Sequence, residues 1–209
     1  MDSNNIQDSF LFKIKHYFEQ INKTYLIISR PKNLTVFATL INFLNLNPNL
    51  KFVNVITNLG FVDMTPKKQN YIDDILSQIE SFFNSSSMQI VKHEKYDLND
   101  GTCELLGSID YSDKYIEKII SLLNVRFEKC YFMSTPIIAE NIKLNRERPK
   151  TFFKQLYETN KFLNKVVSLN QDKYLLVDIQ DINYTFDGVH YTKKGHQQIF
   201  EKIKESIKI

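Results

Sequence analysis

The sequence predicts one α/β domain, in which a parallel β-sheet is covered by helices on both faces, and three observations predict this fold class. Apolar runs of about five residues alternate with amphipathic stretches of about 12 to 18 residues, an order typical of parallel strands joined by right-handed crossovers. The runs are apolar throughout, as strands buried on both faces require. With 209 residues, 43% of them hydrophobic and 24% charged, the chain is long enough to bury the core of a single domain.

The N-terminal part predicts a helix, a strand and a second helix. Residues 9–21 carry apolar side chains at helical spacing, and we assign residues 1–23 as a helical extension that packs on the domain spanning residues 1–209. Thr24–Ser29 is a short apolar run, which predicts a buried strand. The next helix is predicted to open at Pro31, because proline is well tolerated in a first turn.

From residue 51 onward, the same periodicities predict alternating strands and helices. Residues 69–83 are the clearest helix, because their apolar positions form one wide stripe. Residues 84–112 contain two strand candidates, Met88–Val91 and Thr102–Leu106, on either side of the polar stretch His93–Gly101. The other predicted elements are strands at Lys51–Thr57, Cys130–Ser134 and Tyr174–Ile179, a loop over 58–68, and helices over 113–124, 151–168 and 192–207.

Charge and composition narrow the classes of partner. The net charge is +3, too small an excess to indicate the basic face that tracks a phosphate backbone, so we expect no nucleic-acid partner. The basic stretch Lys143–Lys150 is interpreted as a solvated loop. No apolar run is long enough to span a bilayer, and the first residues lack the pattern of a secretory signal. We therefore expect a cytoplasmic protein without a membrane span.

The cysteines and most of the histidines are interpreted as structural or surface residues. Cys103 and Cys130 lie in apolar surroundings, which favours buried thiols in a reducing compartment over a disulfide framework. His16 and His93 do not pair with a cysteine or carboxylate at metal-ligand spacing, so no metal site is predicted. His196 is expected to be a surface residue or a contact at the rim of the site.

The segment Asp187-Gly188-Val189-His190 carries the strongest functional signal. It follows the last predicted strand by one loop and precedes the last helix, which places both polar side chains at the carboxyl edge of the sheet. An acyl-transfer site needs a histidine that takes the proton of a weak nucleophile, and a group that holds this histidine in the right tautomer. Asp187 and His190 have a suitable spacing on a turn. The alternative interpretation is a capped helix start with a surface histidine.

In its setting between a strand and an amphipathic helix, the segment Asp187–His196 resembles the last conserved block of the SGNH (GDSL-type) hydrolases, a family of esterases, lipases and carbohydrate deacetylases. The resemblance implies a flavodoxin-like, three-layer α/β fold, which agrees with the predicted order of elements. It also implies a Ser-His-Asp triad without a cofactor, in which Asp187 is the orienting acid and His190 the general base. Gly195 matches the family's glycine at the start of the last helix.

The chain departs from the family at the nucleophile motif, Gly-Asp-Ser. Ile27-Ile28-Ser29 stands at the matching place, so Ser29 is the implied nucleophile and its backbone N–H an implied oxyanion donor. The Gly and Asp before the serine are missing, and Arg30-Pro31 follows it, where Pro31 has no N–H to donate. Arg30 is a candidate substrate-binding residue, the alternative being a surface position.

Two further blocks of the family supply oxyanion donors. Gly60, in Asn58-Leu59-Gly60 after the second strand, matches the glycine whose N–H points into the oxyanion hole, and a turn glycine is a compatible alternative. Two places compete for the Gly-x-Asn block. Asn99 has the right side chain, whereas Gly107–Asp110 has the right setting between a strand and a helix but carries Ile109 at the asparagine position.

These residues favour a serine esterase or O-acyltransferase that acts on small acyl esters, and the resemblance implies an O-acetylated carbohydrate as the substrate class. The alternative is a catalytically altered protein that keeps the fold and binds a carbohydrate or protein partner, or performs another transfer reaction. The missing Gly-Asp before Ser29 favours this alternative, in which the basic stretch Lys143–Lys150 would hold an anionic ligand.

Overall fold

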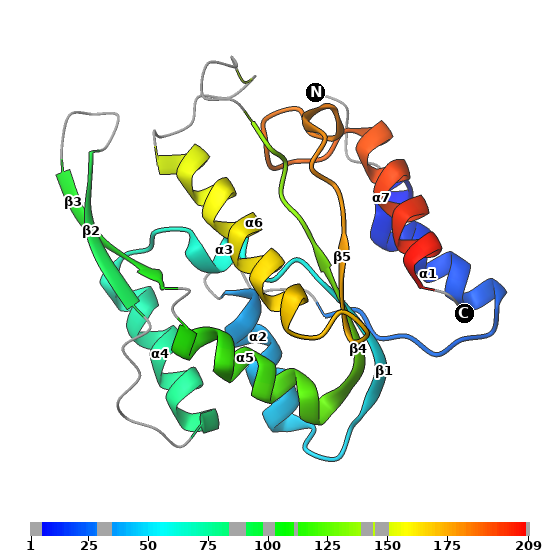
Figure 1. Cartoon of the computed structure of the whole chain (residues 1–209), viewed down its shortest axis with the longest axis horizontal. Helices are drawn as coiled ribbons and strands as arrows, with labels where there is room; N and C mark the ends of the chain where they lie inside the picture. The colour runs from blue at the N-terminus through cyan, green and yellow to red at the C-terminus, as the bar shows by residue number, and fades with distance from the viewer. Residues whose placement is uncertain are drawn as a thin grey trace.

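The computed structural model describes residues 6–28, 35–83, 91–97, 103–110, 113–138, 144 and 151–207, and shows a mixed α/β arrangement around a small open parallel sheet (Figure 1). Within these residues the sheet has three strands, β1 (Phe52–Thr57), β4 (Phe127–Met133) and β5 (Tyr174–Val177), in the order β1-β4-β5. The central strand β4 pairs in parallel with both neighbours, in the registers Phe52↔Phe127 and Cys130↔Tyr174. These strands confirm three of the predicted apolar runs.

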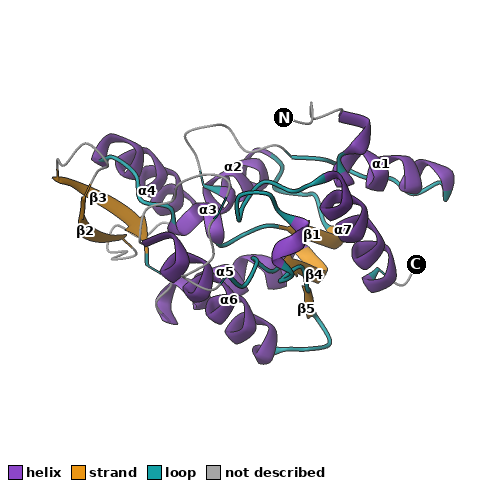
Figure 2. Cartoon of the chain, turned by 90° about the horizontal axis from the view of Figure 1, so that it is seen from above, coloured by secondary structure: helices purple, strands orange, loops and turns teal. Residues whose placement is uncertain are grey.

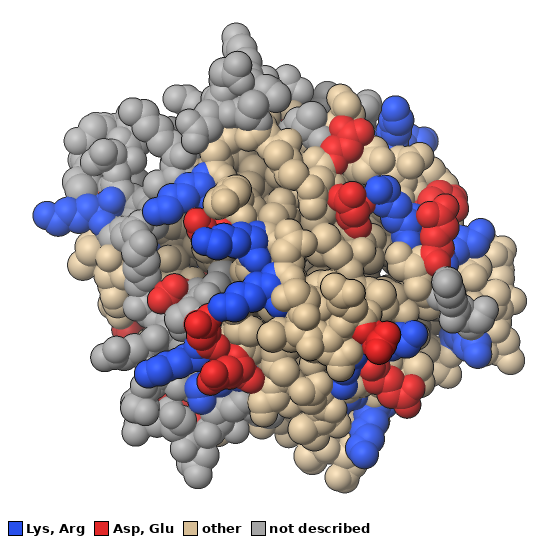
Figure 3. Space-filling view, viewed as in Figure 1, with Lys and Arg blue, Asp and Glu red and all other residues tan. Residues whose placement is uncertain are grey.

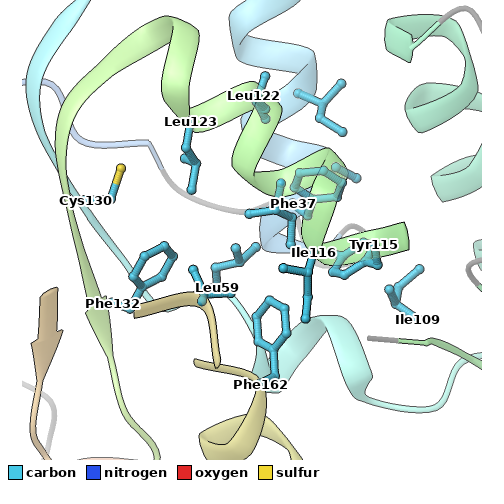
Figure 4. Packing of buried hydrophobic residues seen from close by; sticks show 14 of the residues in the cluster. Phe37, Leu59, Ile109, Tyr115, Ile116, Leu122, Leu123, Cys130, Phe132 and Phe162 are labelled. Carbon is cyan, nitrogen blue, oxygen red and sulfur yellow. The ribbon is translucent and has the colours of Figure 1, made fainter. Parts of the chain in front are cut away.

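Both faces of β4 are buried under helices. Because side chains alternate along a strand, Cys130 and Phe132 join the larger apolar cluster (Figure 4), whereas Tyr131 and Met133 join a second one. Figure 2 shows α7 on one side of the strands and α5 and α6 on the other. The larger cluster includes residues of α2 (Val36–Leu46), α4 (Gln69–Phe83), α5 (Asp113–Arg126) and α6 (Thr151–Leu169), and the second includes residues of α1 (Phe10–Gln20) and α7 (Lys193–Ser206).

The helices predicted from apolar stripes are confirmed, and capping side chains set some of their ends. α4 has the predicted bounds. The helix predicted to open at Pro31 begins instead at Val36, because Thr35 Oγ1 accepts a backbone N–H of the first turn at 3.0 Å. The predicted loop 58–68 contains a short helix, α3 (Phe61–Met64).

The buried strand predicted at Thr24–Ser29 is wrong for the residues that the structure describes there. Residues 23–28 form no strand, and Leu26, Ile27 and Ile28 are exposed. β1 is hydrogen-bonded directly to β4, and no described residue pairs with this apolar run. An apolar, β-branched composition favours a strand only where a sheet edge receives it, which composition does not reveal.

An antiparallel hairpin of β2 (Val91–Asp97) and β3 (Cys103–Ile109) lies apart from the parallel sheet, beside α4 (Figure 1). Two backbone hydrogen bonds between Lys67 and Gly107, of 2.7 and 2.8 Å, attach it to the domain. Of the first strand candidate, Met88–Val91, only Val91 is described, and β2 runs on through residues that we predicted to be a polar connection. A strand with a solvated face tolerates this polarity, and His93 and Lys95 are exposed.

The described surface carries charges of both signs. On the face shown in Figure 3, basic and acidic side chains are interspersed. The absence of a nucleic-acid partner stays a prediction. Among the described helices, none has the length and apolar character needed to cross a bilayer.

Candidate functional site

The connection between β5 and α7, residues 178–192, contains a short 3-10 helix, Ile182–Tyr184, and then a tight turn at residues 185–191, after the carboxyl end of the sheet. Thr185 and Tyr191 form an antiparallel bridge, and the N–H of Phe186 donates to the carbonyl of His190 at 3.0 Å. At the tip, Gly188 has a φ of 83°, a conformation that favours glycine, and its N–H donates to Thr185 Oγ1 at 3.1 Å. The turn thereby sets the predicted acid and base side by side.

Asp187 and His190 form a hydrogen-bonded pair. Asp187 is 1% exposed, and its Oδ2 lies 2.8 Å from His190 Nδ1. Its Oδ1 accepts the backbone N–H groups of Val189 and His190, at 3.1 and 2.8 Å, so both oxygens of the carboxylate are held. With an ionised carboxylate, which only accepts hydrogen bonds, this contact places a proton on Nδ1, and the corresponding neutral tautomer of the imidazole has a lone pair on Nε2.

The imidazole of His190 faces solvent on the other side. Its side chain is 56% exposed, and among the described residues nothing hydrogen-bonds to Nε2. Its ring stacks on that of Phe186, with centroids 5.6 Å apart and planes 20° apart. A neutral imidazole with an available Nε2, at the carboxyl edge of a parallel sheet, can take a proton from a hydroxyl group and return it later.

An apolar cluster beneath the turn joins the loops that follow all three parallel strands. A Cβ at Gly188 would lie 2.8 Å from Ile138, in the loop after β4, and 2.9 Å from Phe152 of α6. Phe152 packs edge-to-face on Phe61, at the start of α3 after β1, with ring centroids 5.9 Å apart. Val189 packs on the same cluster. The turn that carries Asp187 and His190 is therefore anchored by packing to the other two loops of this edge.

Two polar side chains of α6 hold the loops after β1 and β4. Gln155 Nε2 donates to the carbonyl of Phe61 at 2.7 Å and to Thr65 Oγ1 at 2.8 Å. Asn160 pairs with the backbone of Thr135, accepting its N–H at 2.8 Å and donating to its carbonyl at 2.9 Å. We did not expect either residue from the sequence. The sequence feature that could have pointed to them is a polar side chain that interrupts the apolar stripe of a predicted helix.

Gly60, the predicted oxyanion donor, lies between β1 and α3 with a φ of 130°. Its N–H donates to Asp63 Oδ2 at 3.2 Å, so donation to an oxyanion requires exchange of this hydrogen bond, and the role stays a prediction. Asp63 is fully buried, and its Oδ1 accepts the N–H of Phe37 in the first turn of α2, at 2.9 Å. Burial raises the pKa of Asp63, although the hydrogen bonds and Lys67 oppose the rise. The sequence did not point to Asp63.

Three of the predicted site residues, Ser29, Arg30 and Asn99, lie outside the described residues, so their roles stay predictions. The competing place for the Gly-x-Asn block, Gly107–Asp110, does end a strand and precede a helix, as expected, but the strand is β3 of the antiparallel pair and Gly107 lies within it, opposite His93. There, however, the N–H of Gly107 already donates to the carbonyl of Lys67 at 2.8 Å, which ties this glycine to the hairpin attachment.

The remaining candidates for chemistry have structural roles in the described part of the chain. Cys130 is a free, buried thiol, and burial raises its pKa to about 12, so it does not form the reactive thiolate at neutral pH. His196, expected at the surface or rim, is partly buried, and its Nδ1 accepts the N–H of Phe10 at 3.3 Å. The described residues contain no group of three His, Cys, Asp or Glu side chains placed to hold a metal ion.

In comparisons with known proteins, neither the models of protein families nor the curated proteins gave a match to this chain. For Asp187 and His190 the chemistry is therefore argued from their geometry, whereas the roles of Ser29, Arg30 and Asn99 rest on the resemblance in sequence alone.

Proposed function

We propose that the protein is a serine esterase or O-acyltransferase of the SGNH type that acts on small acyl esters. The observation that carries the proposal is the 2.8 Å hydrogen bond between the buried carboxylate of Asp187 and Nδ1 of His190, whose imidazole is exposed after the carboxyl end of β5. This edge is where parallel sheets place their active sites. The three-layer, flavodoxin-like fold is part of the proposal, and the helices on both faces of the sheet support it.

In the proposed reaction, Ser29 Oγ attacks the ester carbonyl carbon while His190 Nε2 takes the hydroxyl proton. Asp187 stabilises the imidazolium, and the N–H groups of Ser29 and Gly60, with the amide of Asn99, receive the oxyanion. When the intermediate collapses, the bond to the leaving alcohol breaks and Nε2 returns the proton to that oxygen. Water or a second alcohol then attacks the acyl-serine, again with His190 as base, and releases an acid or a new ester. No cofactor takes part.

An O-acetylated carbohydrate is the proposed substrate class, with Arg30 as a contact residue. A base whose side chain is 56% exposed suits a bulky polar alcohol, since a long acyl chain needs an apolar channel. We also propose that the chain is one domain that works in a reducing compartment, the cytoplasm, which the free thiol of Cys130 suits.

A second candidate function is that of a protein that keeps the fold and binds a carbohydrate or protein partner without hydrolysis. One observation favours it: the N–H of Gly60 donates to Asp63 at 3.2 Å instead of pointing to an oxyanion. The residues before Ser29, Ile27 and Ile28, also differ from the Gly-Asp of the family that the chain resembles.

Labelling with a fluorophosphonate separates the two candidates without knowledge of the natural ester. The reagent reacts with a serine that a histidine activates, and peptide mass spectrometry identifies that serine. We expect label on Ser29 in the wild type, and its loss in Ser29→Ala and His190→Ala. His93→Ala is the matched control, because His93 is exposed and bonded to Gln69 on the hairpin side.

Hydrolysis of an aryl acetate by the same four proteins is expected to follow the labelling. A folded wild type that takes no label and does not hydrolyse the ester supports the binding protein. Label that persists in both Ser29→Ala and His190→Ala contradicts the triad.

A further inference from the structure

Phe186 lies beside the proposed base, on the turn that also carries it. The rings of Phe186 and His190 stack with their centroids 5.6 Å apart and their planes 20° apart. The backbone fixes this neighbourhood, because the N–H of Phe186 donates to the carbonyl of His190 at 3.0 Å across the turn. Side chains of residues paired in this way lie on the same side of the two strands. The stack is thus a consequence of the register of the turn.

A hydrogen bond and a ring stack restrain the imidazole of His190 in different ways. The hydrogen bond to Asp187 fixes the position of Nδ1, but the ring can still tilt about this bond. The phenyl ring against its face restrains the plane of the imidazole. Together the two contacts set the direction in which Nε2 points, which neither contact does alone.

The exposure of Phe186 argues against a role in the core. Phe186 is 47% exposed, whereas the core residues Phe37 and Phe132 are fully buried. The apolar cluster beneath the turn is built without it, from residues such as Phe152. The electron-rich face of the ring also attracts the positive charge that His190 gains when Nε2 takes a proton. The turn therefore places this ring against the imidazole and not in the apolar core.

We propose that Phe186 is a positioning residue, which holds the imidazole plane of His190 so that Nε2 faces the nucleophile. This inference rests on the proposed function, in which Nε2 is the general base. A misaligned base slows the chemical step more than it weakens substrate binding. Loss of the ring is expected to lower kcat about tenfold and to leave KM within about twofold.

The kinetic test compares Phe186→Ala, Phe186→Leu and Phe186→Tyr in the hydrolysis of an aryl acetate. Alanine and leucine remove the stack and lower kcat, whereas tyrosine keeps the aromatic face and retains the wild-type kcat. Tyr157→Ala is the matched control, because Tyr157 is an aromatic residue on α6 that is 66% exposed, and it leaves kcat unchanged. A raised KM with unchanged kcat would show that Phe186 contacts substrate, and would overturn the positioning role.

Nuclear magnetic resonance of ¹⁵N-histidine-labelled protein gives a readout that does not depend on catalysis. The imidazole nitrogens report the tautomer and hydrogen bonding of His190, and His190→Ala assigns its signals. We expect Phe186→Ala to shift and broaden the Nδ1–H signal, and Phe186→Tyr to match the wild type. Unchanged imidazole signals in a folded Phe186→Ala protein overturn the proposal. Shifted signals in a protein that neither hydrolyses esters nor takes the fluorophosphonate label reject the proposed function, and then show only that Phe186 holds the imidazole plane.

Discussion

Asp63→Ala tests whether one buried carboxylate joins the start of α2 to the turn after β1. Its oxygens accept the N–H of Phe37 at 2.9 Å and that of Gly60 at 3.2 Å, in a place where Asp63 has no exposed surface. A buried N–H left without an acceptor costs about 1–3 kcal/mol, so two of them cost about 2–6 kcal/mol. The burial of the carboxylate is itself unfavourable, so its removal offsets part of this loss of stability. We therefore expect the free energy of unfolding to fall by about 2–4 kcal/mol.

Urea unfolding followed by far-ultraviolet circular dichroism measures this loss in a chain that has no tryptophan. Asp63→Asn keeps an acceptor for Phe37 but turns an amide NH₂ toward the N–H of Gly60, so we expect about half the loss. Asp74→Ala, at an exposed position of α4, is the matched control and is expected to change the free energy by less than about 0.5 kcal/mol. A loss for Asp63→Ala as small as that of the control would refute the reasoning.

The raised pKa of Asp63 adds a test against pH with a defined sign. Burial raises this pKa above its ordinary value of 3.8. The stability that this carboxyl contributes is therefore present below pH 3.8 and is lost as the pH rises through the raised pKa. Asp63→Asn cannot ionise, so its unfolding free energy should decline less over this range. Parallel curves for the two proteins would show that the pKa is not raised.

Two further predictions concern the helix that follows the site. A Cβ at Gly195 would lie 2.0 Å from the carbonyl oxygen of Tyr184, so the backbone must move to accommodate Gly195→Ala. We expect this variant to lose about 2–4 kcal/mol of unfolding free energy and to show weaker fluorophosphonate labelling of Ser29. Lys194→Ala, at an exposed neighbouring position, should change neither, and an equally silent Gly195→Ala would refute the close contact. For His196, burial lowers the pKa, so its contribution to stability is present above pH 6.5 and is lost as the pH falls through the lowered pKa. Urea midpoints should therefore fall more steeply below pH 6.5 in the wild type than in His196→Gln, and equal slopes would contradict this.

The fold was predictable where an apolar face by itself decides the structure. The stripe of α4 includes Ile72, Ile75 and Ile79, and all three are fully buried, as helical spacing requires. Residues 24–28 show the limit of the same reasoning. Their composition suits a strand, but strand formation also needs a partner edge, and composition does not reveal that β1 pairs directly with β4 and that no described residue pairs with this run.

The candidate site likewise has residues that the sequence predicts and residues that it does not. Asp187 and His190 could be paired from the sequence, because three residues on a turn bring their side chains into local contact. The roles of Asp63, Gln155 and Asn160 could not be predicted, because each holds a backbone group that is distant in sequence. The separations are 26 residues from Asp63 to Phe37, 94 from Gln155 to Phe61 and 25 from Asn160 to Thr135.

Two glycines favour the proposed acid–base role of Asp187 and His190 over the interpretation as a capped helix start. A capped helix start would need only Thr192, whose Oγ1 accepts the N–H of Gly195 at 2.9 Å. The turn has further requirements that capping does not explain. Gly188 combines a φ of 83° with a place where a Cβ would lie 2.8 Å from a side chain, and Gly195 lets α7 approach the backbone at the other end of the turn. With glycine at both places, the buried carboxylate of Asp187 lies against Nδ1 of His190 and the imidazole stays exposed. This arrangement suits a general base better than a helix cap.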